Sequence, residues 1–276
     1  MITAILQVFI VWYTQSVALL ADTVHNFTDA FTSIPLWLAF IIGRRKNNSR
    51  FTYGYGRAED LAGLLILVII GASAVLVFLE SIMRFYHPSS PEHLSVLTLA
   101  GIIGFMGNEA VAQYRIKIGK KIGSEALIAD GLHSRTDGFV SLSVVVGAIG
   151  SYFGYAILDP IIGIIIGFMI LWILKEATPK IINRLMDSID PKIIEEIAHE
   201  IGYIPEVAKV VDVKARWIGR SIFTDIKIIV NRDLTIIESY NIEKLVEAKL
   251  NQKFPVISQI YIEVIPCNHH LKMNCN

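Results

Sequence analysis

The chain has 276 residues, of which 53% are hydrophobic and 18% are charged. Soluble domains usually carry about 25% charged residues, so this composition favours a membrane protein. The 25 basic and 25 acidic residues cancel, which leaves no basic excess to indicate a nucleic-acid partner. The two cysteines, Cys267 and Cys275, lie near the end of the chain, so we expect no disulfide framework to organise the fold.

Long apolar segments fill the first two thirds of the chain. A membrane-spanning helix needs roughly 20 mostly apolar residues. Four segments meet this length easily and a fifth is borderline: Ser16–Gly43, Leu61–Met83, Leu94–Tyr114, Glu125–Tyr152 and Ala156–Leu174. A sixth, Ile2–Thr14, is too short to span alone, so either its start lies upstream or neighbouring helices support it. We therefore predict an all-α domain of about six transmembrane helices over residues 1–182.

Basic residues gather in alternate connections between these segments. They are Arg44, Arg45, Lys46, Arg50 and Arg57, then Arg115, Lys117, Lys120 and Lys121, then Lys175, Lys180 and Arg184. The other connections hold no Lys or Arg. Cytoplasmic loops of membrane proteins are enriched in these residues. We therefore expect a multi-pass protein of the cell membrane with both termini in the cytoplasm.

From about residue 183 the pattern becomes that of a small soluble domain. Asp190 followed by Pro191 is typical of a helix start, and alternating β-branched residues predict strands. The expected elements are a helix, two strands, a helix and a strand, at Ile193–Ile201, Val207–Trp217, Ile222–Val230, Ile236–Phe254 and Val256–Ile265. This order predicts an α+β, ferredoxin-like αββαβ domain in the cytoplasm. We assign it to residues 183–276, together with a C-terminal tail.

One fourteen-residue pattern occurs twice. Ala18–Phe31 reads ALLADTVHNFTDAF and Ala126–Phe139 reads ALIADGLHSRTDGF. In each copy a His precedes an Asp by four residues, so the two side chains share one face of a helix. Two such helices side by side would present two imidazoles and two carboxylates, a set that suits tetrahedral Zn²⁺. The four predicted ligands are His25, Asp29, His133 and Asp137.

Further polar residues lie at membrane depth near this predicted site. Asp22 and Asp130 each precede the motif His by three residues. Because the two helices run in opposite directions, Asp22 lies one turn toward the outside and Asp130 one turn toward the cytoplasm. Each is placed to handle ions on its own side. Asn108 and Glu109 in the fourth helix are candidates for an ion or proton pathway, or for hydrogen bonds between helices.

Intramembrane charges need a compensating role. One charge at the bilayer centre costs about 2.5–3.5 kcal/mol on insertion scales, so a duplicated His and Asp pattern disfavours a merely structural reading. Its ligands must be deprotonated to bind a metal, so metal binding releases protons. No GxxxxGK[ST] motif occurs, and we therefore expect ion gradients rather than ATP to supply energy.

The two copies resemble the paired signature motifs of the cation diffusion facilitator family. YGYGRAEDLAG, at Tyr53–Gly63, is similar to that family's entry to the third helix. The resemblance covers nearly the whole chain. It implies a homodimeric membrane transporter, not an enzyme, that exports Zn²⁺ or a similar divalent cation in exchange for protons. The metal is then a transported substrate at His25, Asp29, His133 and Asp137, and no prosthetic group is implied.

The chain departs from some members of that family. Asn48, Phe51 and Tyr55 take the positions of a second metal site, and none is a good zinc ligand. The positions of a His-rich site in some C-terminal domains hold Lys227, Tyr240, Glu263 and Ile265. We therefore expect no metal at either place. The tail group is either a weak metal site or mobile, and consists of Cys267, His269, His270 and Cys275.

Three alternatives remain open. The substrate could be Fe²⁺, Co²⁺, Cd²⁺ or Mn²⁺, although sets made only of carboxylates suit Mn²⁺ better than sets with imidazole do. An intramembrane zinc hydrolase could use the same ligands, but a catalytic site keeps an open coordination position. A membrane metal sensor is the third. The four-ligand set favours carriage over catalysis.

Overall fold

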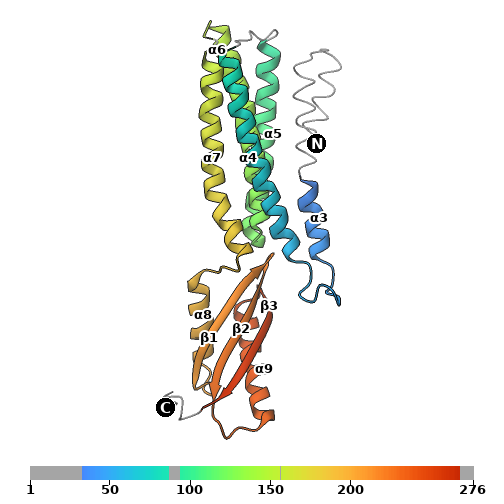
Figure 1. The fold of residues 1–276 in the computed structure, drawn as a ribbon, viewed down its shortest axis with the longest axis vertical. Helices are drawn as coiled ribbons and strands as arrows, with labels where there is room; N and C mark the ends of the chain where they lie inside the picture. The colour runs from blue at the N-terminus through green and yellow to red at the C-terminus, as the bar shows by residue number, and fades with distance from the viewer. Residues whose placement is uncertain (1–32, 87–93, 156, 268–276) are drawn as a thin grey trace. The chain divides into compact units, whose positions relative to one another are not determined.

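The computed structural model describes residues 33–86, 94–155 and 157–267 (Figure 1). The chain divides into two compact units, Met1–Ile182 and Asn183–Asn276. The predicted helix Ile2–Thr14 and most of Ser16–Gly43 lie outside the described residues. Each unit is considered by itself below.

The described part of the first unit is helical. Its helices are α3 (Ile34–Gly43), α4 (Arg57–Tyr86), α5 (Leu94–Ile122), α6 (Glu125–Tyr152) and α7 (Leu158–Leu185). Helices α5 and α6 pack along their length, and α6 also contacts α4 and α3. Among the described helices, α4 and α7 are long and apolar enough to cross a membrane. Helices α5 and α6 carry more polar side chains, and several of these contact one another.

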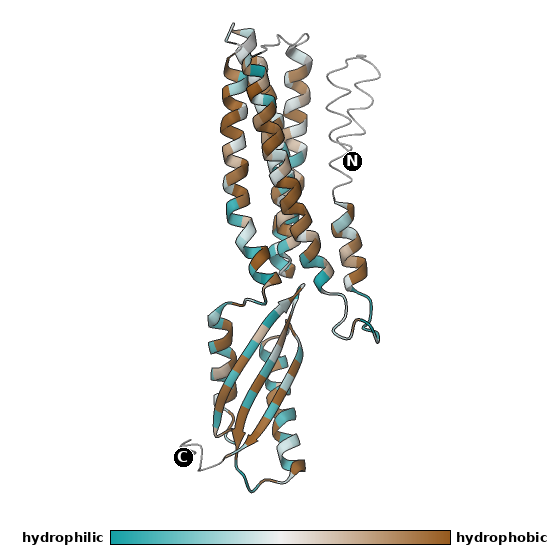
Figure 2. Cartoon of the chain, viewed as in Figure 1, coloured by the Kyte–Doolittle hydropathy of each residue, from teal (hydrophilic) through white to brown (hydrophobic). Residues whose placement is uncertain are grey.

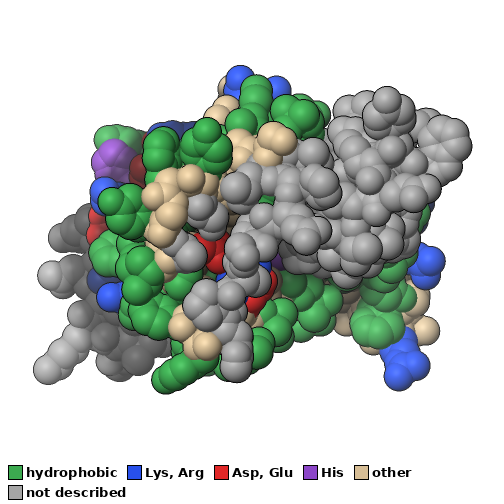
Figure 3. Space-filling view, turned by 90° about the horizontal axis from the view of Figure 1, so that it is seen from above, with side chains coloured by type: hydrophobic (Ala, Val, Ile, Leu, Met, Phe, Trp, Pro, Cys, Tyr) green, Lys and Arg blue, Asp and Glu red, His purple; other side chains and the backbone are tan. Residues whose placement is uncertain are grey.

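The outward surface of this unit is apolar. Val68, Leu76, Phe168 and Trp172 are all more than 60% exposed. Figure 2 shows hydrophobic residues along most of α4 and α7, and among the described residues visible in the end-on view of Figure 3, hydrophobic side chains are the most frequent kind. A surface of this kind is disfavoured in water and favoured against lipid.

Three of the described helices extend beyond their apolar segments, and α4 does so at both ends, since it spans Arg57–Tyr86 where Leu61–Met83 was predicted. Helix α5 continues to Ile122 and α7 to Leu185, whereas the apolar segments end at Tyr114 and Leu174. The prediction that Arg115, Lys117, Lys120 and Lys121 lie between two helices was therefore wrong, because all four lie within α5. Arg57 likewise begins α4, and Lys175, Lys180 and Arg184, predicted to follow the last helix, lie within α7. Lys and Arg are good helix formers and are favourable near a helix C-terminus. A helix therefore need not stop where its hydrophobicity does.

Helix α7 packs closely against α4 through small residues. A Cβ atom at Gly163 would lie 2.1 Å from Ser81 Oγ, and one at Gly167 would lie 2.7 Å from the ring of Phe78. An ion pair joins the end of α4 to the start of α7, with Arg84 Nη1 2.7 Å from Asp159 Oδ2. Arg84 was not among the basic residues from which the orientation was predicted, and it lies at the opposite end of α4 from Arg57.

The second unit has the predicted αββαβ order. Its elements are α8 (Pro191–Gly202), β1 (Lys209–Ile218), β2 (Ser221–Val230), α9 (Ile236–Lys253) and β3 (Ile257–Pro266). Strand β2 lies in the centre of the sheet, antiparallel to β1 and parallel to β3. Asp190 caps α8 by accepting a hydrogen bond from the Lys192 amide. The fold class predicted from the sequence is confirmed.

One face of this sheet forms the core of the second unit. Alternate residues of β2, including Ile222, Ile226 and Ile228, pack with Ile197 of α8 and Val246 of α9. Asp225 and Lys227, which alternate with these residues, are polar and less buried, and Figure 2 shows alternating colours along the strands. The unit therefore has a hydrophobic core of its own.

Candidate functional site

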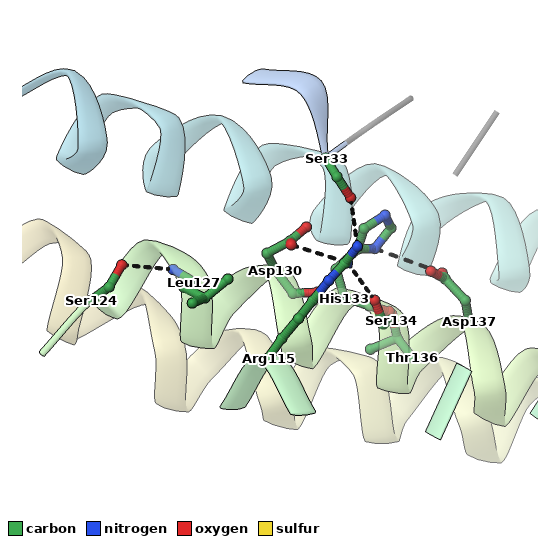
Figure 4. A network of polar contacts seen from close by, with 9 residues as sticks. All are labelled: Ser33, Arg115, Ser124, Leu127, Asp130, His133, Ser134, Thr136 and Asp137. Atoms are coloured by element: carbon green, nitrogen blue, oxygen red, sulfur yellow. Dashed lines mark hydrogen bonds and ion pairs between the residues drawn. The ribbon is translucent and has the colours of Figure 1, made fainter. Parts of the chain in front are cut away.

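The second copy of the repeated motif lies in the first half of α6. His133 is 3% exposed and Asp137 is 9% exposed. Nδ1 of His133 lies 3.6 Å from Oδ1 of Asp137, so the two side chains face each other across one helical turn (Figure 4). The predicted juxtaposition of these two groups on one helix is present.

The first copy of the motif lies outside the described residues. His25, Asp29 and Asp22 belong to it, so their meeting with α6 stays a prediction. Within residues 33–86, 94–155 and 157–267, no three His, Cys, Asp or Glu side chains are grouped as a metal site. The described residues therefore supply two of the four predicted ligands.

Hydroxyl groups next to the motif bond to the carbonyls of α6 itself. Thr136 Oγ1 donates to the carbonyl of His133 at 2.6 Å, and Ser141 Oγ donates to that of Asp137 at 3.1 Å. Ser134 Oγ donates to the carbonyl of Asp130 at 3.2 Å. These local bonds satisfy the hydroxyls within the helix. The imidazole and the carboxylates remain as the strong metal-binding groups on this part of α6.

Asp130 has a cationic partner that the sequence analysis missed. The carboxylate is 2% exposed, and its Oδ2 lies 3.0 Å from Nη1 of Arg115. Arg115 also donates to Ser134 Oγ at 2.8 Å and to Ser33 Oγ at 2.9 Å (Figure 4). Ser33 immediately precedes α3, so one guanidinium joins α5, α6 and the start of α3.

A sequence signal for this contact was available. The turn between α5 and α6 contains Gly123, whose φ is +69°, a value that favours glycine. Arg115 lies eight residues before Gly123 and Asp130 seven residues after it. Two helices that form a tight hairpin bring residues at such similar distances from the turn side by side.

Glu109 also has an arginine partner. Arg135 Nη2 donates to Glu109 Oε1 at 2.8 Å and its Nε donates to Oε2 at 3.1 Å. Gln113 donates to the same carboxylate at 3.1 Å. Asn108 lies beside Gly138, where a Cβ atom would be 3.4 Å from Asn108 Cβ. Both candidate pathway residues of α5 therefore lie against α6, and Glu109 is held by an ion pair.

The loop before α4 is held by its own side chains. Asn48 Nδ2 donates to the Tyr55 hydroxyl at 2.7 Å, and the rings of Phe51 and Tyr55 lie 4.6 Å apart. Asn48 Oδ1 accepts from the amide of Phe51 at 2.8 Å. The three residues that we expect at the positions of a second metal site thus contact one another.

In the second unit, an ion pair joins two of the residues that we expect at the positions of a His-rich site present in some C-terminal domains. Lys227 Nζ lies 2.8 Å from Glu263 Oε2, and this hydrogen bond raises the pKa of Lys227. Tyr240 is exposed on α9. Of the tail group, Cys267 is buried, whereas His269, His270 and Cys275 lie outside the described residues.

Known proteins resemble the chain along nearly all of its length. Residues 1–177 match the cation efflux transmembrane domain and residues 189–267 match the cytoplasmic domain of cation efflux proteins. A probable cation efflux system protein of Mycobacterium tuberculosis is 42% identical over 268 residues, which cover 97% of this chain and 81% of the relative.

A more distant relative and a solved structure are also similar to parts of the chain. The manganese efflux system protein MneS of Bacillus subtilis is 28% identical over 271 residues, covering 95% of this chain and 91% of that protein. Among solved structures, the C-terminal domain of MamM aligns at 22% identity with a TM-score of 0.27. It covers 28% of this chain and 100% of that domain.

Proposed function

The chain belongs to the cation diffusion facilitator family of integral membrane cation efflux transporters, and we propose that it exports Zn²⁺ from the cytoplasm in exchange for protons. The proposed transport site consists of His25, Asp29, His133 and Asp137. The observation that carries the proposal is the buried pair on α6, where an imidazole nitrogen faces a carboxylate oxygen at 3.6 Å. Because the family transports cations, an intramembrane hydrolase is no longer an alternative.

The spacing of this pair suits a tetrahedral ion. Zinc bonds to nitrogen and oxygen are about 2.0–2.2 Å long, so two ligand atoms of a tetrahedral ion lie about 3.3–3.6 Å apart. The distance of 3.6 Å between His133 Nδ1 and Asp137 Oδ1 corresponds to one edge of such a tetrahedron. His25 and Asp29, with the same spacing in sequence, would supply the opposite edge.

Proton exchange follows from the chemistry of these ligands. Imidazole and carboxylate bind a metal only when deprotonated, so each loading event releases protons that were bound. Loading is then favoured on the less acidic side of the membrane and release on the more acidic side. Asp130 and Asp22 would pass ions on the cytoplasmic and outer sides of the site, with Asn108 and Glu109 beside the pathway.

The remaining features of the proposal concern orientation and assembly. Basic residues near the ends of α3, α5 and α7 favour cytoplasmic termini in a cell-membrane protein. The match to the cytoplasmic domain of cation efflux proteins favours a homodimer formed partly by the second unit. Without His ligands at Lys227 and Glu263, this dimer would be held by protein contacts rather than by metal.

Manganese is the principal competing substrate, because one relative is named as a manganese efflux protein. Two imidazoles favour Zn²⁺, whereas Mn²⁺ is better matched by carboxylate and carbonyl oxygen. Fe²⁺, Co²⁺ and Cd²⁺ would also fit a mixed nitrogen and oxygen set. The proposal therefore ranks Zn²⁺ first.

Uptake into proteoliposomes tests the proposal. We expect wild-type vesicles to accumulate Zn²⁺ faster than Mn²⁺, and Asp137→Ala to reduce zinc uptake by about tenfold or more because a ligand is lost. Ser143→Ala is the matched control on α6, since the Ser143 hydroxyl bonds only to the Val140 carbonyl at 2.6 Å among the contacts resolved for it. Zinc uptake that is unchanged in folded Asp137→Ala would exclude the proposed site.

A further inference from the structure

Arg115 is a cation placed beside the transport site of a cation carrier. Its side chain is 25% exposed and that of Asp130 is 3% exposed. The guanidinium lies between the carboxylate of Asp130 and the hydroxyls of Ser33 and Ser134, so it is held from three sides (Figure 4). Ser134 is the residue next to His133, so this contact lies immediately beside the predicted ligand.

Only one of the two carboxylate oxygens of Asp130 takes part in the ion pair with Arg115. Oδ2 faces Arg115, and the Ser33 hydroxyl is a further neighbour of the carboxylate, whereas Oδ1 is buried with no hydrogen bond of ordinary geometry from the described residues. Leaving a charged oxygen buried without a hydrogen bond is costly. A divalent cation at Asp130 would remove that cost, but it would also be repelled by the guanidinium only one contact away.

The position of Asp130 makes this competition relevant to transport. It precedes His133 by three residues, so the two side chains lie about one turn apart on α6. In the proposed orientation α6 begins at the cytoplasmic surface, and an incoming ion would meet Asp130 before His133. A group that neutralises the charge of Asp130 therefore changes the apparent affinity of the site for a metal ion arriving from the cytoplasm.

We propose that Arg115 is a tethered counter-ion that occupies Asp130 when no metal is present and must leave it for a divalent cation to reach the site. This inference rests on the proposed function and adds a gating residue to it. The long arginine stem allows the charged head to move toward the cytoplasmic end of α5. Arg115 thus lowers the apparent affinity for metal on the cytoplasmic side and, by returning to Asp130, helps the ion to leave.

A structural brace is the competing explanation, because the same contacts also hold α3, α5 and α6 together. The two explanations differ in their kinetic consequences. A counter-ion acts through Asp130, so its removal strengthens metal binding and slows release. A brace acts through helix packing, so its removal lowers stability and activity without lowering KM.

The test compares Arg115→Gln, Arg115→Lys, Asp130→Asn and the double variant Arg115→Gln/Asp130→Asn. Uptake into proteoliposomes gives KM and kcat, and calorimetry in detergent gives the Kd of the metal. Lys120→Gln is the matched control, because it removes the same charge from an exposed position of α5. Wild-type uptake is read first and decides the proposed function; the series then uses whichever divalent metal the wild-type protein carries.

We expect Arg115→Gln to lower KM and Kd by about fivefold or more, in the usual range of coupling between sites, and to lower kcat. Arg115→Lys should lower KM by a smaller factor, because an ammonium group keeps the charge but loses the fork that binds several acceptors. Asp130→Asn should raise KM, and Arg115→Gln should then have no further effect on KM. Lys120→Gln should match the wild-type protein.

An unchanged or higher KM in Arg115→Gln would contradict the proposal that Arg115 is a counter-ion. The same holds if Arg115→Gln still changes KM when Asp130 is already Asn. Either result would favour the structural brace. If Arg115→Gln does not fold, Arg115→Lys decides the matter alone. In that case a lowered KM supports the counter-ion, and an unchanged KM contradicts it.

Discussion

Replacing Gly131 by alanine tests how closely α5 and α6 must approach at the site. Gly131 lies between Asp130 and His133 on the face of α6 that meets α5. A Cβ atom there would lie 2.7 Å from Ile116 Cγ1 and 3.1 Å from both the Ala112 carbonyl oxygen and the Ile116 amide. The last two atoms belong to backbone, so they cannot move without shifting α5.

The expected change in the free energy of unfolding of Gly131→Ala is the sum of two opposing effects. Extra methyl groups in a packed interior typically cost about 1–3 kcal/mol, whereas replacing glycine by alanine within a helix gains about 0.5–1 kcal/mol. We therefore expect Gly131→Ala to lower the free energy of unfolding by about 1–2 kcal/mol. Moving α5 outward would also lengthen the contact between Arg115 and Asp130.

Gly71→Ala on α4 is the matched control. A Cβ atom at Gly71 would lie 3.6 Å from Leu174 Cδ2, which is an ordinary van der Waals contact. Only the helix preference then remains, and we expect a gain of about 0.5–1 kcal/mol. Thermal unfolding of both variants in the same detergent gives the comparison. If Gly131→Ala were as stable as Gly71→Ala, the close packing of α5 against α6 would be refuted.

The other predictions use ion pairs, metal preference and assembly. Glu109→Gln should destabilise the protein by about 0.5–1 kcal/mol, because its ion pair with Arg135 is partly exposed, and Glu109→Gln/Arg135→Gln should recover part of the loss in thermal melts. His25→Asp should shift uptake from Zn²⁺ toward Mn²⁺; an unchanged metal profile would place selectivity elsewhere. The isolated second unit should sediment as a dimer with or without a chelator, and dimerisation only on adding Zn²⁺ would contradict this. Because the hydrogen bond to Glu263 raises the pKa of Lys227 above its ordinary 10.5, this pair should stabilise the unit below that pH. Its contribution should be lost as the pH rises through the raised pKa, and melts of Lys227→Met beside wild type at neutral and high pH measure this.

Local patterns predicted the elements of the second unit well. Asp190 and Pro191 marked the start of α8, and alternating β-branched residues marked β1 and β2, because capping and strand alternation depend on neighbouring residues. The span of α6 was predicted to the residue. The ends of α5 and α7 were not, because hydropathy reports the thickness of the bilayer and not the length of a helix.

The site was predicted where it depends on one helix and missed where it depends on two. The spacing of His133 and Asp137 placed them on one face of α6, and the structure has them facing each other. The pairing of Arg115 with Asp130 requires the register of α5 against α6, which composition and periodicity do not contain. Arg115 was therefore read as a loop residue, although the position of Gly123 in the hairpin indicates its true neighbour.

The most direct test of the account records zinc and proton fluxes together. Proteoliposomes with an acidic interior would be given external Zn²⁺ while an internal zinc dye and an internal pH dye are read in the same sample. The account predicts zinc entry that accelerates with the imposed pH gradient, accompanied by alkalinisation of the interior, with both signals lost in Asp137→Ala. Zinc entry without proton movement, or both signals persisting in Asp137→Ala, would contradict exchange at the proposed site.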